Sequence, residues 1–171
     1  QVGIALLLGA ALLEHLVIPV PLAVPPAAPP VYAWLGAAEQ RDIQAVLELP
    51  VGATPRGAEL DRITMRQFYQ IQHWRPLATG YSGLIPFGTS DMLRRVQRLP
   101  DDETLRYLAI LGVDTIVIHR DEYEPAKLAE LLAWADATPL LERRAEVGDA
   151  LVYTIGSDAA LAMEIPAGAS I

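Results

Sequence analysis

The 171-residue chain contains no cysteine, which excludes a disulfide framework and a thiolate metal site. Basic residues are also scarce, because 13 Lys and Arg stand against 21 Asp and Glu and the formal net charge is −8. A nucleic-acid surface needs a basic face to neutralise phosphates, so this balance argues against such a partner. The glycines form neither a G-x-G-x-x-G pattern nor a P-loop, so nucleotide binding has no support.

The opening of the chain is apolar. Residues 2–13 carry no charge, and Glu14 and His15 are the first breaks in the run. A secretory signal peptide would show a basic start and a small-residue cleavage site, and neither is obvious. We therefore interpret residues 1–18 as the end of a transmembrane helix, in a chain cut from a longer protein. The alternative is a buried helix of a soluble domain, which the lack of a polar face in residues 2–13 disfavours.

Prolines gather directly after this opening. Residues 19–30 read PVPLAVPPAAPP and hold six of the 14 prolines. Proline fixes φ and removes a backbone donor, so we expect a stiff, extended, proline-rich spacer here. The length of the chain beyond it suits one domain, which we place at 31–156, followed by a tail at 157–171.

The pattern of residues 31–156 predicts an α/β domain with a small mixed sheet and helices on its faces. Apolar, β-branched runs end at proline or charge and indicate buried strands, and the sequence flanking Gly148 and Asp149 indicates a hairpin. Strand 113–119, helix 124–136 and the strand near 140 have the lengths of a βαβ crossover. The predicted order is helix 31–40, strand 45–50, helix 60–72, a loop, two helices within 89–111, strand 113–119, helix 124–136 and two hairpin strands.

The loop within 70–87, QIQHWRPLATGYSGLIPF, is the stretch with the most chemical variety. An exposed indole can stack on a sugar ring, a guanidinium can bind phosphate or carboxylate, and an imidazole titrates near neutral pH. The alternative is a scaffold in which the indole fills the core, the guanidinium bonds loop carbonyls and the imidazole holds a turn. The candidate ligand-binding residues are His73, Trp74, Arg75, Tyr81 and Ser82.

Other catalytic patterns are weak. The segment GYSGL has Gly83 directly after Ser82 and therefore departs from the G-x-S-x-G pattern of a nucleophile elbow. None of the three histidines, His15, His73 and His119, lies three or four residues from another, which is the spacing of a local metal-ligand pair, and we predict no metal and no cofactor. Glu48 ends one strand and Asp114 begins another, yet nothing in the sequence ties these two carboxylates together.

Several segments resemble the extracytoplasmic C-terminal part of bacterial polytopic membrane proteins related to the GT-C glycosyltransferases. The resemblance covers most of residues 10–155, and its most specific pieces are the HWRP…GYSG loop and the strand LGVDTIVIH. The other pieces are LLEHLVIPVPL, PPVYAWL, AVLELP, LRYLAI and ALVYTI.

The resemblance implies a domain on the extracytoplasmic side of the cell membrane, attached to the rest of a membrane protein. GT-C enzymes use a lipid-linked sugar donor, and their catalytic acidic residues lie in an early loop that this chain does not contain. We therefore expect no catalytic residue here, but a domain that caps the membrane active site or binds a glycan, an acceptor or a lipid-linked sugar. The alternatives are a non-catalytic structural or interaction module and, less favoured, a freestanding soluble enzyme.

Overall fold

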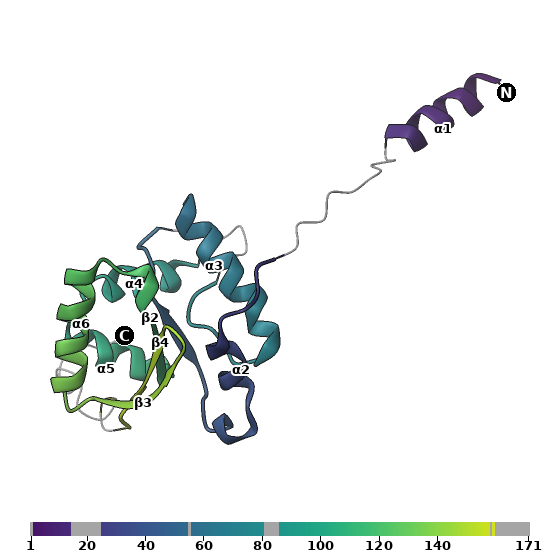
Figure 1. Cartoon of the computed structure of the whole chain (residues 1–171). Helices are drawn as coiled ribbons and strands as arrows, with labels where there is room; N and C mark the ends of the chain where they lie inside the picture. Colours follow the sequence, from purple (N-terminus) through teal and green to yellow (C-terminus); the bar gives the residue numbers. More distant parts are fainter. Residues whose placement is uncertain (1, 15–24, 55, 81–85, 158, 160–171) are drawn as a thin grey trace.

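A computed structural model describes residues 2–14, 25–54, 56–80, 86–157 and 159. Its first element is α1 (Val2–Glu14), a helix of 13 residues drawn apart from the head in Figure 1. None of the described side chains of α1 belongs to either hydrophobic core of the head. Its side chains Ile4, Leu7, Leu12 and Leu13 are exposed. Within the described part of the chain, no helix combines the length and the apolar character needed to cross a bilayer.

The remaining elements form one α/β head, as predicted, and their order matches the order read from the sequence. The strands are β1 (Val46–Leu49), β2 (Thr115–His119), β3 (Leu141–Val147) and β4 (Ala150–Ile155). The helices are α2 (Pro30–Gly36), α3 (Ala58–Tyr69), α4 (Phe87–Val96), α5 (Asp102–Ile110) and α6 (Pro125–Ala137), with short 3₁₀ turns η1 (Ala38–Gln40), η2 (Gln70–Gln72) and η3 (Arg120–Glu122).

The strands form a mixed sheet in the order β1-β2-β4-β3. β1 and β2 are parallel, and β4 is antiparallel to both β2 and β3. The expected crossover from β2 through α6 to β3 is therefore present only in part: the two strands run in the same direction, but β4 lies between them. The neighbouring parallel pair is β1 and β2, joined through α3, α4 and α5.

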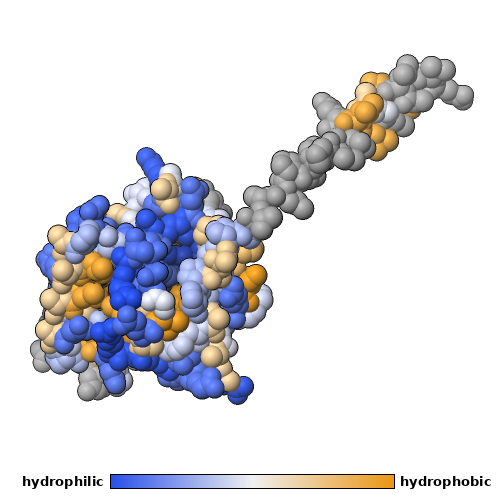
Figure 2. Space-filling model, viewed as in Figure 1, coloured by the Kyte–Doolittle hydropathy of each residue, from blue (hydrophilic) through white to orange (hydrophobic). Residues whose placement is uncertain are grey.

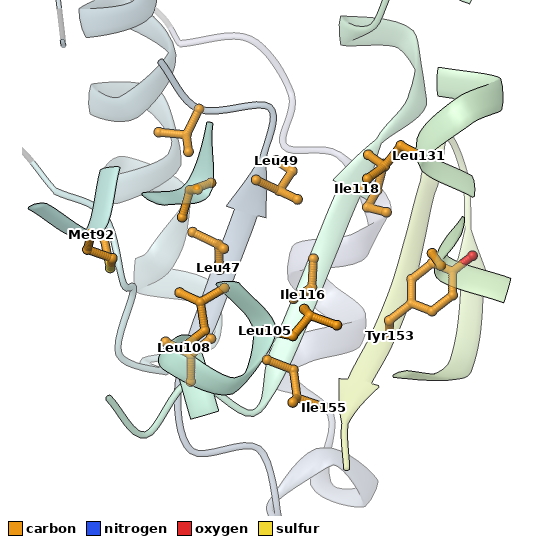
Figure 3. Packing of buried hydrophobic residues seen from close by; sticks show 14 of the residues in the cluster. Leu47, Leu49, Met92, Leu105, Leu108, Ile116, Ile118, Leu131, Tyr153 and Ile155 are labelled. Atoms are coloured by element: carbon orange, nitrogen blue, oxygen red, sulfur yellow. The ribbon is translucent and has the colours of Figure 1, made fainter. Parts of the chain in front are cut away.

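Both faces of the sheet are covered, because every residue of β1 and β2 is buried. On one face, Leu47 and Leu49 of β1 pack with Ile116 and Ile118 of β2 against residues of α4, α5 and α6 (Figure 3). On the other face, α2 and Tyr69 of α3 pack on a second core that contains residues of β1, β2 and β4. Side chains alternate across a strand, so residues 46 and 48 of β1 share this second face with residues 117 and 119 of β2.

Residue types at the element ends explain where several helices begin and end. Asp101 caps α5 by accepting hydrogen bonds from the backbone amides of Glu103 and Thr104. Gly112 follows α5 with φ of 83°, the left-handed conformation that glycine adopts without strain. Pro125 occupies the first turn of α6, where its missing N–H has no partner to lose.

Candidate functional site

A buried carboxylate lies at the carboxyl end of β1. Glu48 is only 1% exposed, and it lies between Leu47 and Leu49 in the apolar strand β1. Its Oε2 atom accepts a hydrogen bond of 2.7 Å from the Tyr32 hydroxyl and lies 2.7 Å from Nε2 of His119 at the end of β2. The parallel register pairs Glu48 with Val117, so His119 lies one pleat further along the same face. The sheet therefore brings together two polar residues that are far apart in the sequence.

Arg66 of α3 completes this cluster and is 3% exposed. Its Nη1 atom donates to the main-chain oxygens of Glu48 at 3.1 Å and Pro50 at 2.8 Å, while Nη2 donates to Glu122 at 2.8 Å. Its Nε atom lies 3.5 Å from Glu48 Oε2. The guanidinium thus ties α3 to the end of β1 and supplies the positive charge that a buried carboxylate requires.

The ionisation of the cluster follows from these contacts. Burial alone would raise the pKa of Glu48, but the hydrogen bond from His119 and the charge of Arg66 outweigh it and hold that pKa below its usual value. Glu48 is therefore an ionised acceptor, which makes His119 Nε2 the donor and leaves Nδ1 as the ring nitrogen not bonded to Glu48. Burial, reinforced by the Glu48 charge, raises the pKa of Tyr32, so its hydroxyl stays protonated.

One acceptor of the cluster has no partner. Glu48 Oε1 is buried and makes no hydrogen bond to any described residue. Buried polar atoms are normally paired, so such an atom points to a bound water or to another polar group that the side chains do not provide.

A cavity of about 550 Å³ adjoins this cluster on the α2 and α3 side of the sheet. Tyr32, Arg66 and His119 form part of its wall, so the buried cluster meets the cavity directly. Ligands of open α/β sheets bind beyond the carboxyl ends of parallel strands, where this cavity lies. Its other lining residues come from the end of the spacer, from α3, from η3 and from the hairpin turn: Pro29, Pro30, Ala58, Asp61, Arg62, Met65, Tyr69, Asp121, Glu122, Val147, Gly148, Asp149 and Ala150.

The candidate residues of the loop are not gathered at one point. His73 is buried, its ring stacks on Tyr32 with centroids 6.0 Å apart, and its Nδ1 accepts a hydrogen bond of 3.0 Å from the Arg75 amide. Trp74 is instead 79% exposed, so it does not fill the core as the scaffold alternative expected. Arg75 is half-buried, and its Nε atom is buried without a partner among the described residues. Tyr81 and Ser82 lie outside the described residues, and a binding role for these five stays a prediction.

Asp114 is separate from the cluster. Its carboxylate accepts hydrogen bonds from the backbone amides of Gln44 at 2.8 Å and Ala45 at 3.3 Å, at the opposite end of β1 from the cavity.

Sequence analysis thus singled out Glu48 but none of the residues that contact it. His119 is a second polar residue at the carboxyl end of an apolar strand, and this pattern could have indicated it. The sequence alone does not say which strands are neighbours, so the contact between the two residues was not predictable.

The class of molecule that these features define is an α/β domain with a four-stranded mixed sheet and a cavity at the carboxyl ends of its parallel strands. No model of a protein family, no curated protein and no solved structure matches this chain. The described residues contain no group of three or more His, Asp or Glu side chains arranged to hold a metal ion.

Proposed function

We propose that the chain is the extracytoplasmic domain of a membrane glycosyltransferase-like protein, and that its cavity binds a glycan or acceptor sugar. The domain has no catalytic role by itself and acts as a cap over a membrane active site. The observation that carries the binding part of this proposal is the cavity at the carboxyl ends of β1 and β2, with its buried cluster of Tyr32, Glu48, Arg66 and His119.

The lining of the cavity suits a ligand rich in hydroxyl groups. Asp61, Asp121 and Asp149 offer carboxylate acceptors, while Arg66 and His119 offer nitrogen atoms in the wall. A hydroxyl group both donates and accepts, so it can satisfy both kinds of partner. The acidic balance of the lining favours neutral or amino sugars over phosphorylated ones.

The membrane location is supported by α1. Its side chains Ile4, Leu7, Leu12 and Leu13 are exposed and belong to neither core of the head. An apolar helix with no polar face is stable only in an apolar environment, which lipid supplies. Deletion of residues 1–18 should therefore leave a folded, monodisperse head whose flotation with lipid vesicles is strongly reduced. Unfolding of the head on that deletion would contradict this part of the proposal.

The binding test uses the full chain in lipid nanodiscs and a panel of methyl glycosides of neutral and amino hexoses, followed by saturation-transfer NMR. Ala58→Trp places a large side chain at the lining of the cavity, whereas Thr64→Trp, also exposed on α3, is absent from the lining. We expect saturation transfer with the unchanged chain and with Thr64→Trp, and its loss with Ala58→Trp.

The second candidate function is a structural or interaction module. It is favoured by the internal pairing of Glu48 with Tyr32, Arg66 and His119, because buried ionic clusters also occur as scaffold. Absence of saturation transfer for every glycoside, in a chain whose melting is unchanged by Ala58→Trp, would favour this module over the sugar-binding domain.

A further inference from the structure

An exposed apolar patch lies at the end of α3. Phe68, Ile71 and Trp74 are spaced three residues apart along α3, η2 and the residue that follows, and all three are exposed. The Trp74 amide donates a hydrogen bond of 2.8 Å to the Gln70 carbonyl, so the helical spacing continues to this residue. Residues three apart on a helix lie on one side of it, and we call these three residues the α3-end patch.

Trp74 adopts an unusual backbone conformation. Its φ is 56°, and no other described residue apart from glycine has a positive φ. A bulky side chain in this region costs on the order of 1–3 kcal/mol, and such strain persists where the surroundings impose it. His73 supplies part of that restraint, because its buried ring bonds the Arg75 amide across Trp74. The fold thus holds a large indole in solvent at a conformational cost.

The patch adjoins the point where the spacer joins the head. The Tyr69 hydroxyl donates a hydrogen bond of 3.0 Å to the Pro26 carbonyl, and the Phe68 ring packs against the Tyr69 ring with centroids 5.7 Å apart. The final described residues of the spacer therefore run beside the patch, and Figure 2 shows hydrophobic atoms at the edge of the head where the spacer reaches it. The apolar α1 precedes that same spacer in the sequence.

The two segments that meet beside the α3-end patch contain no acidic residue. The chain has 21 acidic residues, yet residues 15–38 and 62–90 contain none. The first segment includes the spacer and the second includes the α3-end patch, and they meet at the bond between Tyr69 and Pro26. Biological membrane surfaces are neutral or anionic, so carboxylates are unfavourable next to them while exposed aromatic rings are favourable at the headgroup level.

We infer that the α3-end patch is a second membrane contact, which docks the head onto the surface of the bilayer that holds α1. Phe68, Ile71 and Trp74 enter the headgroup region, where their three side chains bring no carboxylate to the lipid. This inference rests on the membrane part of the proposed function, but not on sugar binding. Docking fixes the orientation of the head, so the cavity, which shares Tyr69 with this side, keeps a fixed position relative to the bilayer.

The absence of cysteine allows a site-specific test in the full chain. Gln72→Cys, exposed within η2, and Arg98→Cys, exposed after α4, are each labelled with a polarity-sensitive fluorophore. The chains are reconstituted into phosphatidylcholine vesicles with and without brominated acyl chains. We expect brominated lipid to quench the label at 72 and not the label at 98. Adding Trp74→Ser to Gln72→Cys should lower the docked-to-undocked ratio about tenfold, because an indole leaves the lipid.

The outcomes separate the parts of the proposal. Vesicle flotation without quenching at 72 overturns docking and leaves the α1 anchor in place. Equal quenching at 72 and 98 also overturns it, because contact is then not confined to the α3-end patch. Failure to float overturns both anchor and docking. A label at 72 that responds to methyl glycosides and not to brominated lipid assigns Trp74 to sugar binding instead.

Discussion

Glu48 of β1 and His119 of β2 form a hydrogen bond of 2.7 Å on one face of the sheet, although they are 71 positions apart in the sequence. The bond joins the two parallel strands at their carboxyl ends, which is where the cavity begins. The same Glu48 oxygen accepts the Tyr32 hydroxyl, so α2 is fixed to the same point. This carboxylate therefore has two roles, because it supports the packing of the head and holds the His119 ring in the cavity wall.

Removal of the Glu48 charge should destabilise the head. Glu48→Leu leaves Tyr32 and His119 buried without their acceptor and removes the negative charge beside Arg66. We expect a loss of about 3–5 kcal/mol in the free energy of unfolding. Glu48→Gln keeps the shape and one acceptor, so a smaller loss of about 1–3 kcal/mol is expected. Urea denaturation of the full chain in micelles measures both. Glu146→Gln, at an exposed ion pair with Arg143, is the control and should cost less than about 1 kcal/mol. Equal effects of the Glu48 and Glu146 changes would contradict the central role of the cluster.

Acid should destabilise the protein in two stages. Burial is the main cause that lowers the pKa of His73 from its usual 6.5; the charge of Arg75 adds to it and that of Glu48 opposes it. The folded state thus prefers neutral His73, whose Nδ1 accepts the Arg75 amide, and the resulting stability is present above pH 6.5 and lost as pH falls through the lower folded pKa. Glu48 adds stability that is present above its usual 4.5 and is lost only below that pH.

His73→Asn isolates the first stage, because an asparagine oxygen can accept the Arg75 amide but does not titrate. We expect the decline in unfolding free energy between pH 6.5 and the Glu48 range to become flatter in this variant. The decline at lower pH should remain, because it belongs to Glu48. Urea midpoints measured across this pH range provide the comparison. If the decline in unfolding free energy just below pH 6.5 is as steep in His73→Asn as in the unchanged chain, that decline belongs to a group other than His73.

The order of helices and strands was predictable because each element carries its own signal. The strand Thr115–His119 is β-branched and apolar, and Gly148 with Asp149 separates two strands as a hairpin turn should. The position of β4 between β2 and β3 was not predictable, because a hairpin pattern does not specify which of its strands joins the rest of the sheet. The Glu48–His119 pair was missed for the same reason, because its two members become neighbours only through strand pairing. The exposure of Trp74 was one of two interpretations that the sequence left open, because its composition fits both an indole in solvent and one that fills the core.

Loss of the α5 cap should have a local and moderate effect. Asp101 accepts hydrogen bonds from the Glu103 and Thr104 amides and from the Thr104 hydroxyl. Asp101→Ala leaves those amides at the start of the helix without their partner, and a loss of about 1 kcal/mol in unfolding free energy is expected. Asp101→Asn should retain most of the stability, because an amide oxygen also caps. Thermal denaturation followed by circular dichroism distinguishes the two, and equal losses would mean that charge and not capping is the main contribution.

The contact between α2 and η2 should be sensitive to a single methyl group. A Cβ atom added at Gly36 would lie 2.5 Å from the backbone oxygen of Gln72, and a backbone atom cannot move aside as a side chain can. Gly36→Ala therefore forces α2 away from η2, and overpacking of this kind costs about 1–3 kcal/mol.

Gly88 in α4 has no atom within 4 Å of its added Cβ, so Gly88→Ala should be neutral or stabilise by up to about 1 kcal/mol through helix propensity. The two variants add the same atoms, so a lower urea midpoint for Gly36→Ala than for the unchanged chain, together with no loss for Gly88→Ala, reports the packing clash at Gly36. Since η2 carries Ile71 and precedes Trp74, Gly36→Ala should also reduce the quenching of a label at position 72 by brominated lipid, whereas Gly88→Ala should leave that quenching unchanged. A destabilised Gly36→Ala chain with undiminished quenching would show that the α3-end patch keeps its position without the support of α2.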